Sequence, residues 1–376
     1  MKVVIYESSS RGGNYKYAFA LFEAYKANSK FSKVELLIPS NSHFYPEEGI
    51  HPKLFSDKVT DSGWRNKLTF IVRTLFSPLV LFFHLIGKTK TLVMFNDFEQ
   101  SSAPFWTLLF RIFLRQHRYA VVLHDPNRDH YPPTPAYARF SMRKIMKLMD
   151  LALYHDYLPD KPYYRNTRAK YFSVPHGIYI LPAPDEKLAS GIKTFKGSSC
   201  LFAIIGNIRK EKNYHLAIEA LKNLPEARVI IAGNPANSNV DVESLRKLAE
   251  EKGVQHRILW LIRYLSEPEL ASLIRMSDCI LLNYAATFAS QSGIINMIAP
   301  YKKGVIVSDT QSGMTKLVRR FSLGMIIQAD DVNALEKAME QSIQDPGHQR
   351  GGWENFLEYA SWQHQVTLVT EAYEGL

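Results

Sequence analysis

Short apolar runs typical of β-strands alternate with helical segments along almost the whole chain, and this alternation limits the fold more than any other feature. In the first half, the strand-like runs lie at 3–8, 34–39, 91–97, 119–125, 150–156 and 170–177. They are apolar throughout, as expected for strands that are covered on both faces. Strands that alternate with helices predict parallel sheets with crossover helices, and therefore an α/β fold.

A segment rich in Pro, Gly, Lys and Ser interrupts this pattern from Ile178 to Ser199, and a second series of strands and helices follows it. A chain of 376 residues is also too long for one compact core. We therefore predict two Rossmann-like domains that face a cleft. They would occupy residues 1–178 and 200–355, with a linker at 179–199.

The formal net charge of +10 favours an anionic partner, such as nucleotide phosphates, a lipid surface or nucleic acid. Nucleic acid is not expected, because the basic residues are scattered over both halves without a recognition-helix or RNP-like motif. The amino terminus lacks the apolar stretch of a secretory signal. Cys200 and Cys279 lie in apolar runs without a CxxC partner, so we expect a cytoplasmic protein with reduced thiols.

Residues 68–87 form an apolar stretch that is about long enough to cross a bilayer. Arg73 and His84 argue against a spanning helix, because ionisable groups are costly in hydrocarbon. An amphipathic helix would instead place its apolar side chains in a core or on a lipid surface. These side chains are Phe70, Leu75, Leu79 and Phe82 or Phe83.

Basic residues lie close to this stretch in sequence, and they favour the lipid surface over the core. They are Arg111, Arg115, Arg118, Arg139, Arg143, Lys144 and Lys147. We therefore expect the protein to be peripheral on the anionic inner face of the plasma membrane. The alternative is that the helix belongs to the core and the cations form a solvated face.

Two motifs in the second half are typical of anion sites. The sequence GNIRKEKN at 206–213 follows a buried strand and opens a helix, so that Arg209 can bind phosphate oxygens and Lys212 can add a second charge. The sequence SQSGI at 290–294 again places small residues where a strand leads into a helix. Both motifs lie at the carboxyl ends of strands, where doubly wound sheets bind ligands. Two ordinary capped helices are the alternative.

In the first half, Gly12 and Gly13 follow the first strand, but RGGN is not a GxGxxG fingerprint, so a nicotinamide cofactor is not supported. The glycines allow close approach to a ligand, or simply a tight turn. His124 and Asp125 end another strand, where a histidine can bind a sugar hydroxyl or orient an acceptor. A structural histidine is equally compatible, and His155 and His176 are interpreted as structural or hinge residues.

No DxD triplet occurs, and the DVE sequence at 241–243 falls at a probable helix start, where an acid acts as a cap. No metal site is therefore predicted, and activity is expected to be independent of metal.

With these residues in hand, the chain resembles the retaining GT-B glycosyltransferases of the family 4 type, glycosyl transferases group 1. The resemblance is strongest over 200–330 and is continued by Trp362 and its helix. GNIRKEKN is similar to the family's Gly-x-Ile-Arg-x-x-Lys loop. The other matching pieces are IRYLSEPEL at 262–270, LNY at 282–284, and QSGI with GVIVSD.

The resemblance implies that the C-terminal half holds a nucleotide-sugar donor and the N-terminal half the acceptor. Arg209 and Lys212 would neutralise the donor diphosphate, and His124 would lie beside the sugar. The implied donor-binding residues are Gly206, Asn207, Arg263, Tyr284, Ser290, Gln291, Ser292 and Gly293. Gly12, Gly13 and Asp125 would face the acceptor, and a C-terminal helix within 356–376 would pack back on the N-terminal domain.

The implied function is transfer of a sugar from a nucleotide-sugar to a glycan or lipid-linked saccharide, with retention of the anomeric configuration. The implied process is cell-surface polysaccharide or glycoconjugate synthesis. No cofactor is implied. Many members carry two glutamates eight positions apart in the donor site, whereas Ser290 and Ile298 occupy those positions here. Two alternatives stay open: a sugar-nucleotide epimerase or hydrolase of the same fold, and a non-catalytic subunit that binds a glycan or a nucleotide-sugar.

Overall fold

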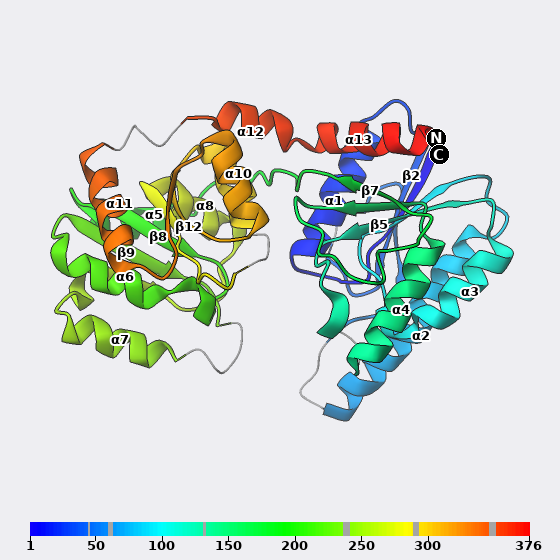
Figure 1. The fold of residues 1–376 in the computed structure, drawn as a ribbon, viewed down its shortest axis with the longest axis horizontal. Helices are drawn as coiled ribbons and strands as arrows, with labels where there is room; N and C mark the ends of the chain where they lie inside the picture. Colours follow the sequence, from blue (N-terminus) through cyan, green and yellow to red (C-terminus); the bar gives the residue numbers. More distant parts are fainter. Residues whose placement is uncertain (44–45, 59–62, 131–132, 236–240, 289–292, 346–350) are drawn as a thin grey trace. The chain divides into compact units, whose positions relative to one another are not determined.

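The computed structural model describes residues 1–376 except 44–45, 59–62, 131–132, 236–240, 289–292 and 346–350 (Figure 1). The chain divides into two compact units. The first unit contains Met1–Gly177 and Ser361–Leu376, and the second contains Ile178–Ala360. Each unit has its own sheet and its own core, and each is described by itself.

The first unit contains a seven-stranded parallel sheet with the order β3-β2-β1-β4-β5-β6-β7. Its strands are β1 (Lys2–Tyr6), β2 (Lys33–Pro39), β3 (Ile50–Leu54), β4 (Leu92–Phe95), β5 (Arg118–Leu123), β6 (Leu151–Tyr154) and β7 (Lys170–Ser173). Its helices are α1 (Gly13–Lys26), α2 (Gly63–Leu85), α3 (Ala103–Phe113), α4 (Pro135–Leu148) and α13 (Trp362–Glu374).

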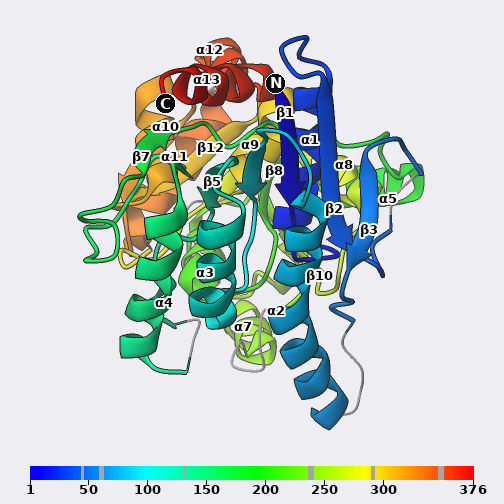
Figure 2. The same cartoon turned by 90° about the vertical axis from the view of Figure 1, so that its right-hand side faces the viewer.

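Helices cover both faces of this sheet, which explains why its inner strands, such as β4, are apolar throughout. Alternate residues of β1 point to opposite faces, so Val3 and Ile5 pack in one core with residues of α1 and α13. Val4 and Tyr6 pack in the other core with residues of α2, α3 and α4. Figure 2 shows these last three helices side by side.

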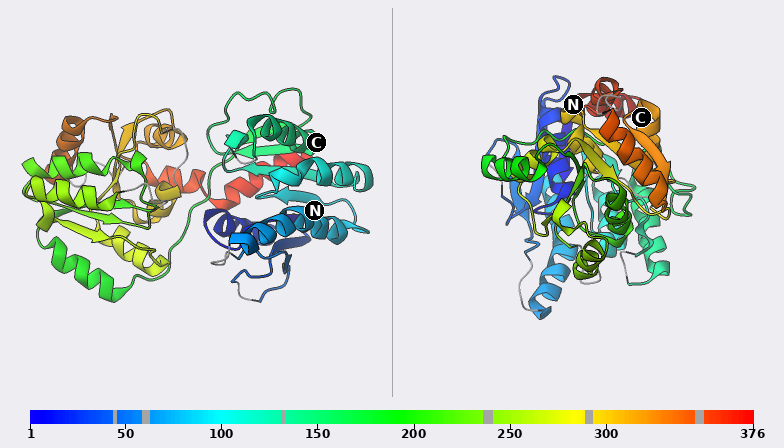
Figure 3. Two further views of the ribbon diagram at one scale, coloured as in Figure 1. Left: turned by 90° about the horizontal axis from the view of Figure 1, so that it is seen from below. Right: turned by 90° about the vertical axis from the view of Figure 1, so that its left-hand side faces the viewer.

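The second unit contains a six-stranded parallel sheet with the order β10-β9-β8-β11-β12-β13, and helices lie on both of its faces (Figure 3). Its strands are β8 (Cys200–Ile205), β9 (Ala227–Ala232), β10 (Ile258–Leu261), β11 (Cys279–Leu282), β12 (Gly304–Asp309) and β13 (Met325–Gln328). Its helices are α5 (Glu186–Lys196), α6 (Tyr214–Ala220), α7 (Val242–Glu251), α8 (Glu267–Met276), α9 (Gly293–Ile298), α10 (Gly313–Phe321), α11 (Val332–Gln344) and α12 (Trp353–Tyr359).

The predicted linker at 179–199 instead belongs to the second unit, because most of it forms α5. Ile192 is fully buried in the core of that unit, while the Lys and Ser residues that suggested a linker lie on the outer part of the helix. Asp185 begins the helix by accepting a hydrogen bond from the Leu188 amide at 2.7 Å. The segment 356–376 is also divided, since α12 belongs to the second unit and α13 to the first.

The side on which the chain adds successive strands changes at one place in each sheet, and we call this place the chain reversal. In the first unit, β2 follows β1 on one side and β4 lies on the other; in the second unit, β9 and β11 flank β8 in the same way. Doubly wound sheets bind ligands beyond the carboxyl ends of the strands at such a reversal. The loops after β1, β4, β8 and β11 are therefore the first places to search for a site.

A buried ion cluster holds β2, β3 and α2 together in the first unit. Only 5% of Glu35 on β2 is exposed, and its Oε1 lies 3.1 Å from Nε2 of His51 and 3.4 Å from Nε2 of His84. The Lys88 ammonium donates to the other carboxylate oxygen. Burial alone would raise the pKa of Glu35, but hydrogen bonds from His84 and Lys88 and the charge of Lys88 lower it far below its ordinary value.

Glu35→Gln is therefore expected to lower the free energy of unfolding at pH 7 by about 2 kcal/mol, because it leaves the Lys88 charge without its partner. The folded pKa of Glu35 lies below its unfolded value, so this stabilisation is present above about pH 4.3 and is lost as the pH falls toward the folded pKa. Urea unfolding at pH 7 and pH 3 would measure both effects. The control is Glu47→Gln, which removes a surface pair with Lys26 and is expected to cost less than about 1 kcal/mol. Equal losses of unfolding free energy in the two variants would contradict a special stabilising role for the buried Glu35 cluster.

Candidate functional site

The loop after β8, residues 206–213, is called the basic loop below. It begins at Gly206 with a φ of +93°, a conformation that favours glycine. A Cβ on Gly206 would lie 3.3 Å from Lys212 Nζ and 3.2 Å from Ile294 Cδ1. Gly233, after β9, approaches so closely that a Cβ there would lie 2.2 Å from the Gly206 carbonyl oxygen. Both glycines are therefore needed for the backbone to pack this tightly at the carboxyl edge of the sheet.

Lys212 lies beneath the basic loop and is only 6% exposed. Its Nζ donates to the Ile205 carbonyl oxygen at 2.5 Å. Burial and the positive charge of Arg209 lower the pKa of Lys212 to about 7. The side chain folds back under the loop, so that its amino group lies against the Gly206 backbone.

Arg209 is exposed at the start of the 3₁₀ turn Lys210–Lys212. Within the described parts of the chain, its guanidinium forms no ion pair, so it can bind an anion. The helix predicted at 213–223 is divided into α6 and a second 3₁₀ turn, Leu221–Asn223. Because α6 has only seven residues, the charged side chains contribute more to the positive potential of the basic loop than a helix dipole does.

The residues directly after β11, which lead toward the second predicted motif, lie next to the basic loop. β11 pairs with β8, and the Ala285 amide, beyond β11, donates to the Glu211 carbonyl oxygen at 2.8 Å. Asn283 Nδ2 donates to the Asn213 carbonyl oxygen at 3.1 Å. Gly293 is the exposed first residue of α9, with open space where a side chain would be. Ser290, Gln291 and Ser292 lie outside the described residues.

Asp330, which follows β13, holds these two loops together. Its Oδ1 accepts from Asn213 Nδ2 at 2.7 Å, and its Oδ2 accepts from the Ala286 amide at 3.0 Å. Sequence reasoning missed Asn213, Asn283 and Asp330. Asn283 directly follows the buried strand β11, a position that could have drawn attention to it, whereas Asn213 and Asp330 carry no such signal.

Two further residues highlighted by the sequence, Arg263 and Tyr284, have partners within the second unit. The guanidinium of Arg263 binds both oxygens of Glu269, at 2.5 and 3.1 Å, and lowers the pKa of Glu269 to about 2. Tyr284 is buried and stacks on Phe288, with ring centroids 3.9 Å apart. A donor contact by Arg263, Tyr284 or the exposed Asn207 stays a prediction. Ile298 is fully buried in the core of the second unit.

In the first unit, His124 follows β5 and joins a chain of hydrogen bonds that begins at β1. Its Nε2 lies 3.0 Å from Asn96 Oδ1, and Asn96 Nδ2 donates to the buried carboxylate of Glu7. An amide oxygen can only accept, so Nε2 carries the hydrogen and Nδ1 is left as the acceptor nitrogen. Burial, and the nearby His155, His176 and Arg128, lower the pKa of His124 well below its ordinary value, so the ring is neutral.

The acids beside this chain were also missed. Burial and the charge of Asp97 raise the pKa of Glu7 to about 8. Asp97 accepts from Ser8 Oγ at 3.2 Å and from Arg128 Nη2 at 3.3 Å. Glu7, Asn96 and Asp97 all follow the strands at the chain reversal, a position that could have drawn attention to them.

The remaining predicted residues of the first unit lie in loops at the same edge. Gly12 has a φ of +88° and precedes α1, whose first residue is Gly13; both are exposed, with open space around them. Asp125 Oδ1 accepts from the Asn127 amide at 3.0 Å and so shapes the loop after His124. These positions are compatible with an acceptor site, and they are equally compatible with plain turns.

His124, His155 and His176 lie together, with ligand atoms within 4.8 Å of one another. The ring of Tyr17 packs against all three imidazoles, at centroid distances of 4.5 to 5.5 Å. We therefore interpret the group as an imidazole and aromatic cluster beneath His124, consistent with structural roles for His155 and His176.

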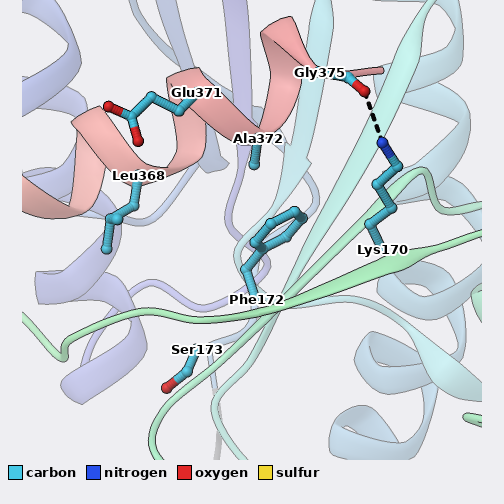
Figure 4. Close-up of a pocket in the computed structure, with 7 residues that line it drawn as sticks. All are labelled: Lys170, Phe172, Ser173, Leu368, Glu371, Ala372 and Gly375. Carbon is cyan, nitrogen blue, oxygen red and sulfur yellow. Dashed lines mark hydrogen bonds between the residues drawn. The ribbon is translucent and has the colours of Figure 1, made fainter.

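A separate pocket lies between β7 and α13 of the first unit (Figure 4). Lys170, Phe172, Ser173, Leu368, Glu371, Ala372 and Gly375 line it. Lys170 Nζ donates to the Gly375 carbonyl oxygen at 2.7 Å. The residues predicted from the sequence do not line this pocket, so it is not part of the candidate site.

Comparison with known proteins adds a family to this geometry. Residues 189–355 match the family model Glycosyl transferases group 1. D-inositol 3-phosphate glycosyltransferases of Mycobacterium bovis and Mycobacterium tuberculosis are 25% identical over 171 residues. The match covers 45% of this chain and 34% of those proteins, about a third of their length.

Similar solved structures cover the whole chain. Sucrose-phosphate synthase from Thermosynechococcus elongatus has a TM-score of 0.69 and 12% identity, and the match covers 100% of this chain and 98% of that one. Anabaena HepE in complex with UDP and glucose has a TM-score of 0.67 and 14% identity, with 100% of both chains covered. Residues 189–355 are therefore similar to the glycosyl transferases group 1 family, and the chain has the two-domain GT-B fold.

Proposed function

We propose that this protein transfers a sugar from a nucleotide-sugar donor to a hydroxyl group of an acceptor. The observation that carries the proposal is the pair of cations in the basic loop, the exposed Arg209 above the buried Lys212, at the chain reversal beside β11. Two positive charges at that place suit the diphosphate of an activated sugar. The family of residues 189–355 supports the same chemistry.

UDP-glucose is the first donor to test. HepE is described in complex with UDP-glucose, and a trehalose-6-phosphate protein of E. coli is described bound with UDP-2-fluoro glucose. The identity to both is low, at 13% and 12%, so GDP-sugars and dTDP-sugars belong in the same screen. The acceptor we propose is a glycan or a lipid-linked saccharide, in cell-surface polysaccharide or glycoconjugate synthesis.

In the proposed reaction, the bond between the anomeric carbon and the diphosphate breaks, and the acceptor oxygen forms a new bond to that carbon. The proton of the acceptor hydroxyl passes to a phosphate oxygen of the leaving group on the same face, so the configuration is retained. Arg209 and Lys212 stabilise the negative charge that develops on the diphosphate. His124, with Nε2 held by Asn96, accepts a hydrogen bond from a sugar hydroxyl at Nδ1 and fixes the position of the sugar.

Asn96→Ala is expected to lower kcat about tenfold and to change the donor KM less, because the variant frees the His124 ring to rotate and to change tautomer. Steady-state kinetics with the donor would measure both constants. Asn96→Asp keeps an acceptor for Nε2 and should retain more activity than the alanine variant. A rise in KM alone would contradict the positioning role.

EDTA is expected to change the transfer rate less than about twofold, because the basic loop carries three cations and a single carboxylate, Glu211, rather than a carboxylate pair suited to a divalent metal. The rate would be measured before and after dialysis against EDTA, with Mg²⁺ and Mn²⁺ added back. A large loss that either metal restores would contradict metal independence.

Product analysis separates transfer from its alternatives. Purified protein would be incubated with UDP-, GDP- and dTDP-sugars, with and without a glycolipid extract from cells, and the products followed by mass spectrometry. We expect sugar transfer that requires the extract. Release of free sugar or an epimerised donor without extract would favour the epimerase or hydrolase alternative. Donor binding without turnover would favour a non-catalytic subunit.

A further inference from the structure

Large apolar side chains on α2 and α3 lie at the surface of the first unit. Seven are more than half exposed: Trp64, Leu68, Phe70, Ile71 and Phe83 on α2, and Leu108 and Phe113 on α3. The two helices pack against each other, so these exposed side chains lie on adjacent helices. Figure 2 shows α2 extending past the ends of α3 and α4. Large apolar side chains that are exposed together on adjacent helices usually mark a binding surface.

The same helices carry only one sign of charge. Three Lys or Arg residues lie on α2, one on α3 and four on α4, and these helices contain no Asp or Glu. All four cations of α4 are exposed, and Lys144 lies over the ring of Phe140. Arg118 does not contribute as the sequence predicts, because its guanidinium lies 3.4 Å from the carboxylate of Asp150.

α2 is long and apolar enough to cross a membrane, with a mean hydropathy of 1.8. Its carboxyl-terminal half, however, is held within the first unit. Ser102 Oγ donates to the Thr74 carbonyl oxygen, the Phe55 amide donates to Ser77 Oγ at 3.2 Å, and Leu81 and Leu85 are fully buried. A spanning helix would lose these contacts, whereas a helix that lies in the interface keeps them.

We propose that the face formed by α2, α3 and α4 binds an anionic lipid bilayer. The apolar side chains of α2 and α3 enter the boundary between headgroups and acyl chains, and the cations of α4 contact lipid phosphates. A second copy of the same face is a poor partner, because a symmetric contact would bring like charges together. The surface does not depend on the proposed function, but with it the acceptor would be a lipid-linked saccharide at that membrane.

Vesicle co-sedimentation without any donor tests the surface. We expect binding to vesicles of phosphatidylcholine mixed with phosphatidylglycerol, weak binding to phosphatidylcholine alone, and release by about 0.5 M salt. Leu68→Ser with Leu108→Ser should weaken binding at least tenfold, and so should Arg143→Glu with Lys144→Glu. The matched controls lie in the second unit: Ile180→Ser, at an 87% exposed apolar residue, and Lys222→Glu with Lys252→Glu. Circular dichroism would verify that each variant is folded.

Three results would overturn the proposal. They are no binding to anionic vesicles, equal losses in the control variants, or wild-type protein that only detergent releases, which would indicate a spanning segment. Light scattering adds a fourth, since a dimer that Leu68→Ser with Leu108→Ser dissociates would assign the face to protein contacts. Donor binding is measured separately, so a failure here is distinguishable from a failure of the proposed function.

Discussion

Arg209→Ala is expected to lower kcat/KM for the nucleotide-sugar by roughly two to three orders of magnitude. The guanidinium is exposed and, within the described part of the chain, is not engaged in an ion pair, so its charge is available to the leaving diphosphate. Loss of one such electrostatic contact raises the barrier by about 3 to 4 kcal/mol. The fold should be unaffected, because an exposed side chain contributes little packing.

Lys210→Ala is the matched control, since Lys210 is also exposed and lies next to Arg209 in the same turn. It should change kcat/KM by a few-fold at most. Both constants would come from initial rates of donor turnover, with thermal unfolding to verify folding. Wild-type rates in Arg209→Ala, or equal losses in the two variants, would remove Arg209 from the site.

Lys212→Met is expected to reduce activity by a similar factor while making the free protein more stable. Burial and Arg209 lower the pKa of Lys212 to about 7 in the folded protein, whereas a lysine in the unfolded chain titrates near 10.4. Between these values the unfolded state binds a proton that the folded state does not, so this group destabilises the fold below about pH 10 and stability rises with pH over that window. Replacement by methionine removes the penalty, and we expect a gain of roughly 1–3 kcal/mol at pH 7.

The same group makes donor binding dependent on pH. A bound diphosphate favours protonated Lys212, so the affinity of the wild-type protein for a nucleoside diphosphate should fall as the pH rises above about 7. The variant should lack this step. Urea unfolding at pH 7 and pH 9 and nucleotide titrations over the same range would measure both effects. A variant that is less stable than the wild-type protein at pH 7 would contradict this account of the buried Lys212. So would a variant whose nucleotide affinity still falls above about pH 7.

The sequence predicts the strands well, because a strand covered on both faces is a continuous apolar run that begins and ends abruptly. β4 and β5 lie within the runs 91–97 and 119–125 that predict them. β3 was missed because its sequence, IHPKL, is that of a half-exposed edge strand. α5 was missed because its Gly, Ser and Lys residues hide a single buried residue, Ile192.

Side-chain direction is what the sequence could not provide. Nothing in GNIRKEKN distinguishes the exposed Arg209 from the buried Lys212, because the loop conformation alone sends one outward and the other beneath Gly206. The hydrogen bond from His124 to Asn96 joins residues 28 positions apart, which only the pairing of β4 with β5 brings together. On α2, the sequence could not decide that Phe82 packs on Phe110 while Phe83 is exposed.

The central claim is that the diphosphate of a donor binds at the basic loop. Isothermal titration calorimetry of UDP, GDP and dTDP into the wild-type protein and Arg209→Ala tests it most directly. We predict that at least one nucleotide binds the wild-type protein with one site per chain, and that Arg209→Ala weakens this binding by roughly tenfold or more, as expected for loss of a charged hydrogen bond. Equal affinity in the two proteins, or no binding of any of the three nucleotides, would contradict the claim.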